Sequence, residues 1–253
     1  MPNELLRARL NLYAVLQNLE ELPRLDQEMG DLCADWDITV QFVVVGGPHA
    51  FVEFSEGRCR HGVGNHPHPT VKLLFVSSKH LNDMFEGGTP PIPAKGFSRL
   101  GFLQKDFAKL TDRLSHYLKP DPEAPFDAAY ARVNTILTFY TAAHAIPILA
   151  ELDPTCQKIT AGTPKGTVQL EILPDGPFAH VHYADSGVRA AKGKTEEPMA
   201  RMSFRDMEAA HGILNGATDS FLALADGGLT MHGLVPIVEN TGLMLDRLEA
   251  YLS

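Results

Sequence analysis

Residue types that bind metal ions gather in one short stretch of the chain. Cys59, His61, His66 and His68 carry the thiol and imidazole groups that hold zinc in many proteins. In an extended strand, side chains two residues apart share a face. Cys59 would then share a face with His61, and His66 would share a face with His68. The spacing matches no established zinc motif, however, and prolines interrupt it. We therefore expect a solvated histidine loop without metal, and a metal-dependent enzyme using residues 59–68 is an alternative.

Other signatures of catalysis or cofactor binding are incomplete. The triplet Gly193-Lys194-Thr195 resembles the end of a phosphate-binding loop, but that motif needs a glycine at position 188, which is Val188. The pair Gly46-Gly47 leads into another predicted strand and lacks the third glycine of a dinucleotide-binding fingerprint. The sequence contains no Gly-x-Ser-x-Gly segment of the kind that presents a catalytic serine. We expect a non-catalytic protein that needs no cofactor.

Length and charge limit the class of protein. A chain of 253 residues with 44% hydrophobic residues can form two ordinary domains, each with its own core. It carries 31 acidic and 22 basic side chains, and its formal net charge is −9. This charge repels a phosphate backbone, so nucleic acid is not expected as a partner.

The pattern of the chain predicts neither export nor insertion into a membrane. Three cysteines are an odd number without close pairing, which indicates a reducing compartment. The N-terminal residues are acidic and amphipathic, whereas a secretory signal is basic and then apolar. Polar side chains and Pro147 interrupt the most apolar run, residues 133–152, so we expect a buried helix there and no transmembrane segment. The expected location is cytoplasmic.

The chain repeats itself at a nearly fixed spacing. The segment Gly47-Pro48-His49-Ala50-Phe51-Val52 returns as Gly176-Pro177-Phe178-Ala179-His180-Val181, an offset of 129 positions (176 − 47). Near the end of each copy stands Asp-Arg-Leu-x-x-Tyr-Leu, at residues 112–118 and again at 246–252. Between the copies, residues 119–125 are rich in proline and charge, as linkers are. We expect a tandem repeat, with one domain at residues 1–120 and a second at residues 121–253.

Each copy predicts the same order of elements: a helix, three strands, a helix, a further strand and a terminal helix. The strand patterns lie at residues 39–45, 51–54 and 71–75 in the first copy, and at 167–173, 181–183 and 200–204 in the second. Strands joined by short turns pair antiparallel, because a parallel crossover needs about a dozen residues. The predicted fold class is α+β, with two similar domains that each have helices on one face of the sheet.

Several short segments resemble a known family. Val71-Lys72-Leu73-Leu74-Phe75, Leu81-Asn82-Asp83-Met84-Phe85-Glu86-Gly87 and Leu229-Thr230-Met231-His232-Gly233 are similar to segments of sterol carrier protein type-two domains. The resemblance implies a mainly antiparallel five-stranded sheet and an apolar tunnel in each domain. It also implies an intracellular carrier whose partner is an apolar small molecule: a fatty acid, an acyl-coenzyme A, a sterol or a related lipid.

The tunnel that this resemblance implies would be lined by apolar residues of both copies. In the second copy they are Phe204, Met207, Leu214, Phe221, Leu222, Met231, Leu234 and Met244. In the first copy they are Phe75, Met84, Phe85, Phe97 and Phe102. The first copy lacks a segment like residues 219–224, so we expect the second copy to bind ligand better. The same side chains can instead fill a dry core, and the alternative is then a pseudo-dimeric scaffold without ligand.

Overall fold

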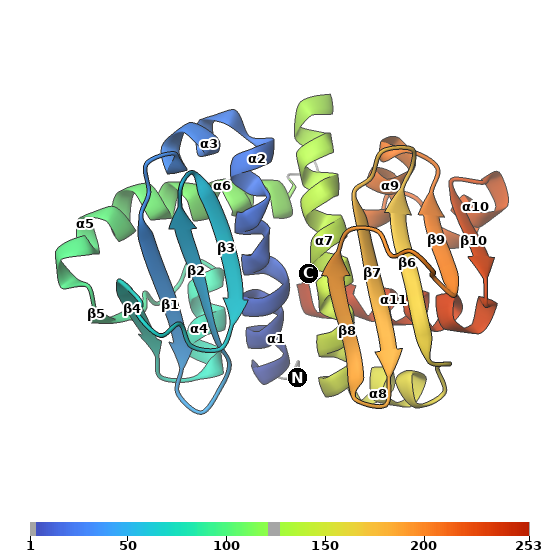
Figure 1. Cartoon of the computed structure of the whole chain (residues 1–253), viewed down its shortest axis with the longest axis horizontal. Helices are drawn as coiled ribbons and strands as arrows, with labels where there is room; N and C mark the ends of the chain where they lie inside the picture. The colour runs from blue at the N-terminus through green and yellow to red at the C-terminus, as the bar shows by residue number, and fades with distance from the viewer. Residues whose placement is uncertain (1–3, 121–126, 253) are drawn as a thin grey trace. The chain divides into compact units, whose positions relative to one another are not determined.

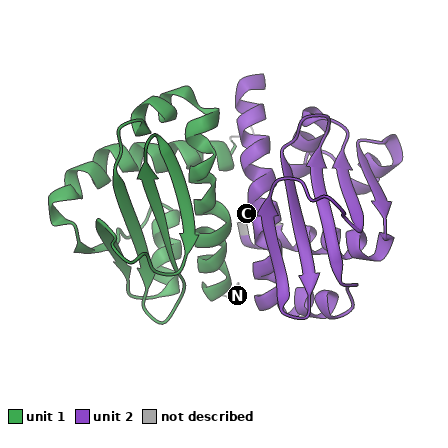
Figure 2. Cartoon of the chain, in the orientation of Figure 1, with its two compact units in different colours: residues 1–124 green, residues 125–253 purple. Residues whose placement is uncertain are grey.

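The computed structural model describes residues 4–120 and 127–252. The chain divides into two compact units, Met1–Ala124 and Pro125–Ser253 (Figure 2). Most of the predicted linker falls on residues 121–126, which lie outside the described residues, so the boundary at residue 120 stays a prediction. Each unit contains one five-stranded sheet with its own helices (Figure 1).

Unit 1 begins with helical segments and continues into its sheet. The first helical segments are α1 (Glu4–Arg9), the π-helix η1 (Leu10–Val15), the 3-10 helix η2 (Leu16–Glu20), α2 (Leu22–Leu25) and α3 (Gln27–Cys33). The strands are β1 (Ile38–Val44), β2 (His49–Ser55), β3 (Arg58–Val63), β4 (Val71–Phe75) and β5 (Ile92–Lys95), in the spatial order β3-β2-β1-β4-β5. The remaining helices are α4 (Ser78–Phe85), η3 (Phe97–Arg99), α5 (Leu100–Phe102), η4 (Leu103–Phe107) and α6 (Ala108–Leu118).

Unit 2 follows the same plan with one additional helix. It begins with α7 (Ala128–Leu152) and α8 (Pro154–Ala161). The strands β6 (Gly166–Ile172), β7 (Phe178–Ala184), β8 (Gly187–Lys192), β9 (Ala200–Phe204) and β10 (Leu229–Gly233) lie in the order β8-β7-β6-β9-β10, which matches unit 1 strand for strand. The other helices are α9 (Met207–Leu214), α10 (Ser220–Asp226) and α11 (Val235–Leu252). The additional helix is α10, because unit 1 connects α4 to β5 without one.

The predicted fold class is confirmed, with one correction to the pairing. Three of the four strand pairs in each sheet are antiparallel, but β1 pairs in parallel with β4, and β6 with β9. After the edge strand, β3 or β8, the chain crosses to the far side of the first strand of the sheet, β1 or β6. The next strand therefore pairs in parallel with that first strand, and both sheets are mixed. Prediction also missed β3 and β8, because these edge strands carry no apolar run. Cys59 and His61 therefore lie in a strand and not in a loop.

One face of each sheet packs against helices. In unit 1 the apolar residues of β1 and β2 alternate toward this face, where the rings of Phe42 and Phe54 lie 6.5 and 6.4 Å from that of Phe107 in η4. In unit 2 the ring of Phe204 on β9 meets Phe139 of α7 at 6.4 Å. The core of each unit thus lies between its sheet and its helices.

The other face of each sheet is crossed by a loop that one buried glutamine holds. In unit 1, Gln41 donates from Nε2 to the carbonyl oxygens of Ala50 (2.9 Å) and Gly64 (3.0 Å), and its Oε1 accepts from the backbone N–H of His66 (2.7 Å). The same three bonds recur in unit 2, from Gln169 to Ala179, Gly193 and Thr195. All three partners keep the offset of 129, so the repeat extends to individual hydrogen bonds.

The repeated Asp-Arg-Leu-x-x-Tyr-Leu segment fixes the last helix of each unit. In unit 1, Asp26 caps α3 by accepting from the Met29 N–H at 3.1 Å. The second carboxylate oxygen of Asp26 accepts from Arg113 Nε at 2.6 Å and from the Tyr117 hydroxyl at 2.9 Å. The arginine and tyrosine of α6 therefore dock this helix onto the N-terminus of α3, where a carboxylate is also favoured by the helix dipole.

Unit 2 repeats this arrangement at the start of α8. Asp153 accepts from the backbone N–H groups of Thr155 and Cys156, and from Arg247 (3.1 Å) and the Tyr251 hydroxyl (2.5 Å) of α11. Burial raises the pKa of the Asp153 carboxyl, but these hydrogen bonds outweigh it and lower that pKa to about 2. The carboxylate is thus charged at neutral pH, and it holds the terminal helix in place.

Among the described helices, α7 is long and apolar enough to cross a membrane by length and composition. The structure buries 78% of its most apolar window, as is usual for the core helix of a globular protein. Apolar residues surround this helix instead of forming one stripe, which is the pattern of a helix covered on several sides.

Candidate ligand-binding site

The predicted lining residues of β9 and β10 share the helix-covered face of the second sheet. Leu229 stands opposite Phe204, and Met231 stands opposite Met202, in the antiparallel pair of these strands. Phe204 and Met202 are buried, and Met231 is half-buried. Two thioethers and a phenyl ring therefore form one apolar surface, and methionine suits a surface that must accept varied shapes.

Helix α11 covers this surface. A Cβ atom added at Gly242 would lie 3.8 Å from the methyl group of Met202, so the helix backbone comes close to the sheet there. Met244 of the same helix is fully buried, and its sulfur lies 3.9 Å from the Thr160 hydroxyl of α8. The structure thus brings Met244 into the core between α8 and α11.

Helix α9 contacts α7 through polar side chains. Met207, His211 and Leu214 fall on one stripe of α9, at positions i, i+4 and i+7. The imidazole Nδ1 of His211 lies 2.9 Å from the Thr135 hydroxyl of α7, so this stripe faces α7. Burial lowers the pKa of His211 and favours its neutral form. Met207 and Leu214 are half-buried along this contact.

Helix α10 presents its large apolar side chains to solvent. Phe221 is 79% exposed and Leu222 is 65% exposed, while the one side chain buried by this seven-residue helix is Ala223. Asp219 caps the helix by accepting from the N–H groups of residues 221 and 222, and Gly227 ends it in the left-handed conformation (φ 77°). The predicted lining residues of α10 therefore lie at the surface in this structure. Leu234, just after β10, is also exposed.

The predicted residues of unit 1 lie in and around an aromatic core. Phe75 is buried, with its ring 6.4 Å from Phe42 and 5.4 Å from the imidazole of His80. The ring of Phe102 packs edge-on against Trp36 at 4.7 Å. Met84 and Phe85 are half-buried on α4. Phe97 is 63% exposed on η3.

The two interiors differ in what fills them. In unit 1, one connected group of aromatic rings, each within 6.5 Å of another, is formed by Trp36, Phe42, Phe54, Phe75, Phe102 and Phe107. The repeat carries Phe54 to Tyr183 (183 − 54 = 129) and Phe107 to Thr241 (241 − 107 = 134). The Tyr183 hydroxyl bonds the Thr241 hydroxyl at 2.8 Å, and burial raises the pKa of Tyr183 to about 12. Unit 2 thus has a hydrogen-bonded tyrosine and threonine where unit 1 packs two phenyl rings against each other.

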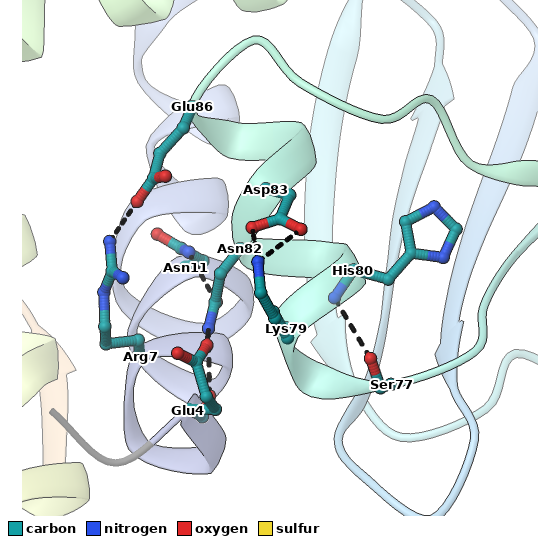
Figure 3. Close-up of polar contacts among 9 residues, drawn as sticks. All are labelled: Glu4, Arg7, Asn11, Ser77, Lys79, His80, Asn82, Asp83 and Glu86. Carbon is teal, nitrogen blue, oxygen red and sulfur yellow. Dashed lines mark hydrogen bonds and ion pairs between the residues drawn. The ribbon is translucent and has the colours of Figure 1, made fainter. Parts of the chain in front are cut away.

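Polar side chains also join the first helix of unit 1 to α4 (Figure 3). Asn82, which is buried on α4, donates from Nδ2 to the backbone and side-chain oxygens of Glu4, and its Oδ1 accepts from Asn11. Arg7 pairs with Glu86 at the end of α4. These contacts hold α4 as the Thr135 and His211 contact holds α9.

In the part of the chain that the structure describes, no group of three or more histidine, cysteine or acidic side chains is placed to hold a metal ion, the histidine-rich segment 59–68 included. His61 on β3 places its Nε2 at 2.8 Å from the backbone oxygen of Leu12. His66 lies in the loop across the other face, with its Nε2 at 3.5 Å from Glu53. The two halves of the cluster thus have separate partners.

Comparison with known proteins finds similar solved structures. No family model matches the chain, and no curated protein sequence matches it. Three similar structures are a UbiJ-SCP2 ubiquinone synthesis protein, sterol carrier protein domain 2 of Helicoverpa armigera and sterol carrier protein 2 from Yarrowia lipolytica. Their identities are 11%, 10% and 14%, and their TM-scores are 0.34, 0.35 and 0.30. They cover 44%, 44% and 46% of this chain and 94%, 87% and 89% of their own.

Proposed function

We propose that the chain is a non-catalytic carrier of apolar molecules, and that unit 2 is its binding domain. The site would lie where the surface of Met202, Met231 and Phe204 meets α10 and α11. The ligand would be a fatty acid, an acyl-coenzyme A, a sterol or a related lipid, as the sequence motifs imply. Unit 1, with its interior filled by aromatic rings, would serve as a structural domain.

The exposure of α10 carries this proposal. A seven-residue helix is too short to be stable by itself in water, and this one buries a single alanine while it shows Phe221 and Leu222 to solvent. Each large apolar side chain that moves out of water when a ligand binds stabilises the ligand-bound state by about 1.5–3 kcal/mol. An apolar ligand beneath or beside α10 would supply the surface that these side chains lack.

The energy of binding is sufficient for a carrier without implying irreversible capture. Burial of about 14 methylene groups at about 0.8 kcal/mol each gives roughly 11 kcal/mol. Association costs about 4–15 kcal/mol in lost motional freedom. The balance allows affinities up to the micromolar range, so the comparison of variants is a better test than any single affinity.

A matched pair of variants tests the proposal. Phe221→Asp places a charge on α10 of unit 2, and Phe97→Asp places one at an exposed phenylalanine of unit 1. Both positions are exposed, so both variants should remain folded by circular dichroism. We expect Phe221→Asp to weaken binding of a fluorescent fatty-acyl probe at least tenfold, because the charge would have to be buried against the ligand. Phe97→Asp should bind as the parent does. Equal binding by folded Phe221→Asp, or no binding of fatty-acyl and sterol probes by the parent, would reject the proposal.

A further inference from the structure

The face of the first sheet opposite the helices ends in a group of apolar side chains. Val43 of β1 stands beside Leu74 of β4, and Leu74 stands opposite Ile92 of β5. Val45 and Val76 follow two residues later and share this face, because alternate residues of a strand do. Val45 and Val76 are each 58% exposed, and Ile92 is 46% exposed. These five residues are called the apolar end of unit 1, and an exposed apolar group of this kind is typical of an interaction surface.

The chain segments around the apolar end carry no charge. They read Val-Gly-Gly-Pro at residues 45–48, Val-Ser-Ser at 76–78 and Gly-Gly-Thr-Pro-Pro at 87–91. His80 of α4 holds two of them together, because its Nδ1 accepts from the Val76 N–H at 3.2 Å and its Nε2 lies 2.9 Å from the Pro90 oxygen. The charged residue that follows, Lys79, pairs with Asp83 of the same helix at 2.6 Å (Figure 3).

Unit 2 makes the same positions polar. Counted from the buried glutamine of each sheet, the equivalent residues of β6, β9 and β10 are Glu171, Ser203 and Thr230. The Ser203 hydroxyl donates to Glu171 Oε1 at 2.8 Å, and the Thr230 hydroxyl donates to the backbone oxygen of Ser203 at 3.3 Å. Arg205 follows β9 where Val76 follows β4. The fold therefore does not require an apolar end, and unit 1 alone has one among the described residues.

Two lysines stand behind the apolar end on the same face. Lys72 of β4 is the cross-strand partner of Lys95 of β5, although like charges in this position destabilise a sheet. Lys72 precedes Leu74 by two residues, which is about 7 Å of strand. Lys95 donates to the Pro69 oxygen at 2.6 Å and keeps its positive charge. Both strands thus change from basic to apolar toward the same end of the sheet.

The negative charge of the chain belongs mostly to its second half. Residues 1–120 carry 13 basic and 14 acidic side chains, whereas residues 121–253 carry 9 basic and 17 acidic ones. Unit 1 is therefore nearly neutral as a whole. Charges separated by more than a Debye length, about 8 Å at physiological ionic strength, are largely screened. At the surface of unit 1, the nearby lysines consequently act more strongly than the net charge of the chain.

We propose that the apolar end of unit 1 docks on the surface of an anionic lipid bilayer. The order along β4 and β5 is that of a bilayer surface, where phosphate groups lie outside the acyl chains. The exposed valine and isoleucine side chains enter the boundary between headgroups and acyl chains, which interfacial segments reach to a depth of about 5–10 Å. The lysines then meet the phosphate groups. A second copy bound through the same face would bring two lysine pairs together, which disfavours a symmetric dimer. The docking surface is independent of the carrier proposal, because all its residues belong to unit 1.

Cosedimentation of the full chain with vesicles tests the apolar part of the surface. The parent should bind vesicles that contain phosphatidylglycerol, and vesicles of phosphatidylcholine more weakly. Val45→Asp and Ile92→Asp should each weaken this binding by about fivefold or more, because a charge would enter the acyl boundary. Leu173→Asp is the matched control in unit 2, since the Leu173 N–H donates to Phe204 as the Val45 N–H donates to Phe75. The control should bind as the parent does. All three positions are exposed, so circular dichroism should show folded variants.

A second pair of variants tests the lysines. Lys72→Gln combined with Lys95→Gln should weaken binding to phosphatidylglycerol by about fivefold for each lysine removed, and should leave binding to phosphatidylcholine unchanged. Lys105→Gln combined with Lys119→Gln removes the same charge from other exposed positions of unit 1 and should have little effect.

Three results would overturn the proposal. The first is a parent that does not bind vesicles containing phosphatidylglycerol. The second is binding that folded Val45→Asp and Ile92→Asp retain at the strength of the parent, because the bilayer would then contact another surface. The third is self-association in analytical ultracentrifugation that Val45→Asp abolishes, without vesicle binding, because the surface would then belong to a contact between two copies of the chain.

Discussion

Replacement of Asp153 by asparagine should destabilise unit 2 by about 2 kcal/mol at pH 7. The carboxylate is 1% exposed, and it joins α8 to Arg247 and Tyr251 of α11. Burial raises the pKa of Asp153, but the bonds from Tyr251, the Cys156 backbone and Arg247 lower it from 3.8 to about 2. At about 1.36 kcal/mol for each pKa unit, this difference favours the charged form in the folded state by roughly 2 kcal/mol. Asparagine keeps an oxygen that can cap α8, so the variant removes mainly the charge.

The destabilisation should depend on pH in a defined direction. The folded pKa lies below the unfolded pKa, so the carboxylate stabilises the folded state fully above pH 3.8. This contribution decreases as the pH falls from 3.8 through about 2, where the folded carboxylate itself takes up a proton. The parent and Asp153→Asn should therefore approach equal stability near pH 2.

Urea unfolding followed by far-ultraviolet circular dichroism measures this difference at pH 7 and at pH 2.5. Fluorescence of Trp36, the one tryptophan of the chain, reports on the unfolding of unit 1. The unfolding transition that it reports at pH 7 should be the same in the parent and in Asp153→Asn. Asp175→Asn, at an exposed turn of unit 2, is the matched control for loss of one charge. An equal loss of stability at both pH values, or a loss at pH 7 no larger than that of the control, would refute the reasoning.

Two other predictions concern the linker and the histidine-rich segment. Limited proteolysis should cut first between Lys119 and Ala124, and it should leave two folded fragments; first cleavage inside either sheet, or two unfolded fragments, would contradict separate domains. Untagged protein should contain no stoichiometric zinc or other transition metal, because His61 and His66 have separate backbone and side-chain partners. One metal ion per chain that disappears in a His66→Ala and His68→Ala double variant would show that this prediction is wrong.

The sequence predicted the elements that have strong periodic patterns. Residues 39–45 and 71–75 became β1 and β4 because runs of buried apolar residues define central strands. The edge strand β3 was missed because its sequence, Arg58-Cys59-Arg60-His61-Gly62-Val63, has the composition of a loop. The parallel pairing was missed because local turn chemistry does not determine which side of β1 the chain reaches next.

The other features that the sequence did not predict depend on contacts between residues far apart in the sequence. The repeated Asp-Arg-Leu-x-x-Tyr-Leu segment was visible in the sequence, but its partner Asp26 stands 87 positions before Arg113. For the candidate site, the apolar pattern led us to propose Phe204 and Met231 as lining residues, and that role stays a prediction. The pattern did not indicate that Phe221 and Leu222 point to solvent, because the same apolar residues would also suit a helix with its apolar side turned inward.

The most direct test of the carrier proposal is a titration of the delipidated chain with a fatty acid, observed through its methionine methyl groups. The chain has eight methionines, and substitution of single residues by leucine would assign their ¹³C-methyl signals. We expect Met202 and Met231, on the covered face of the second sheet, to shift in a saturable manner. Met29, which is buried in unit 1, should not shift. Saturable shifts at Met29 with Met202 and Met231 unchanged, or no shift at any methionine, would contradict the assignment of the ligand to unit 2.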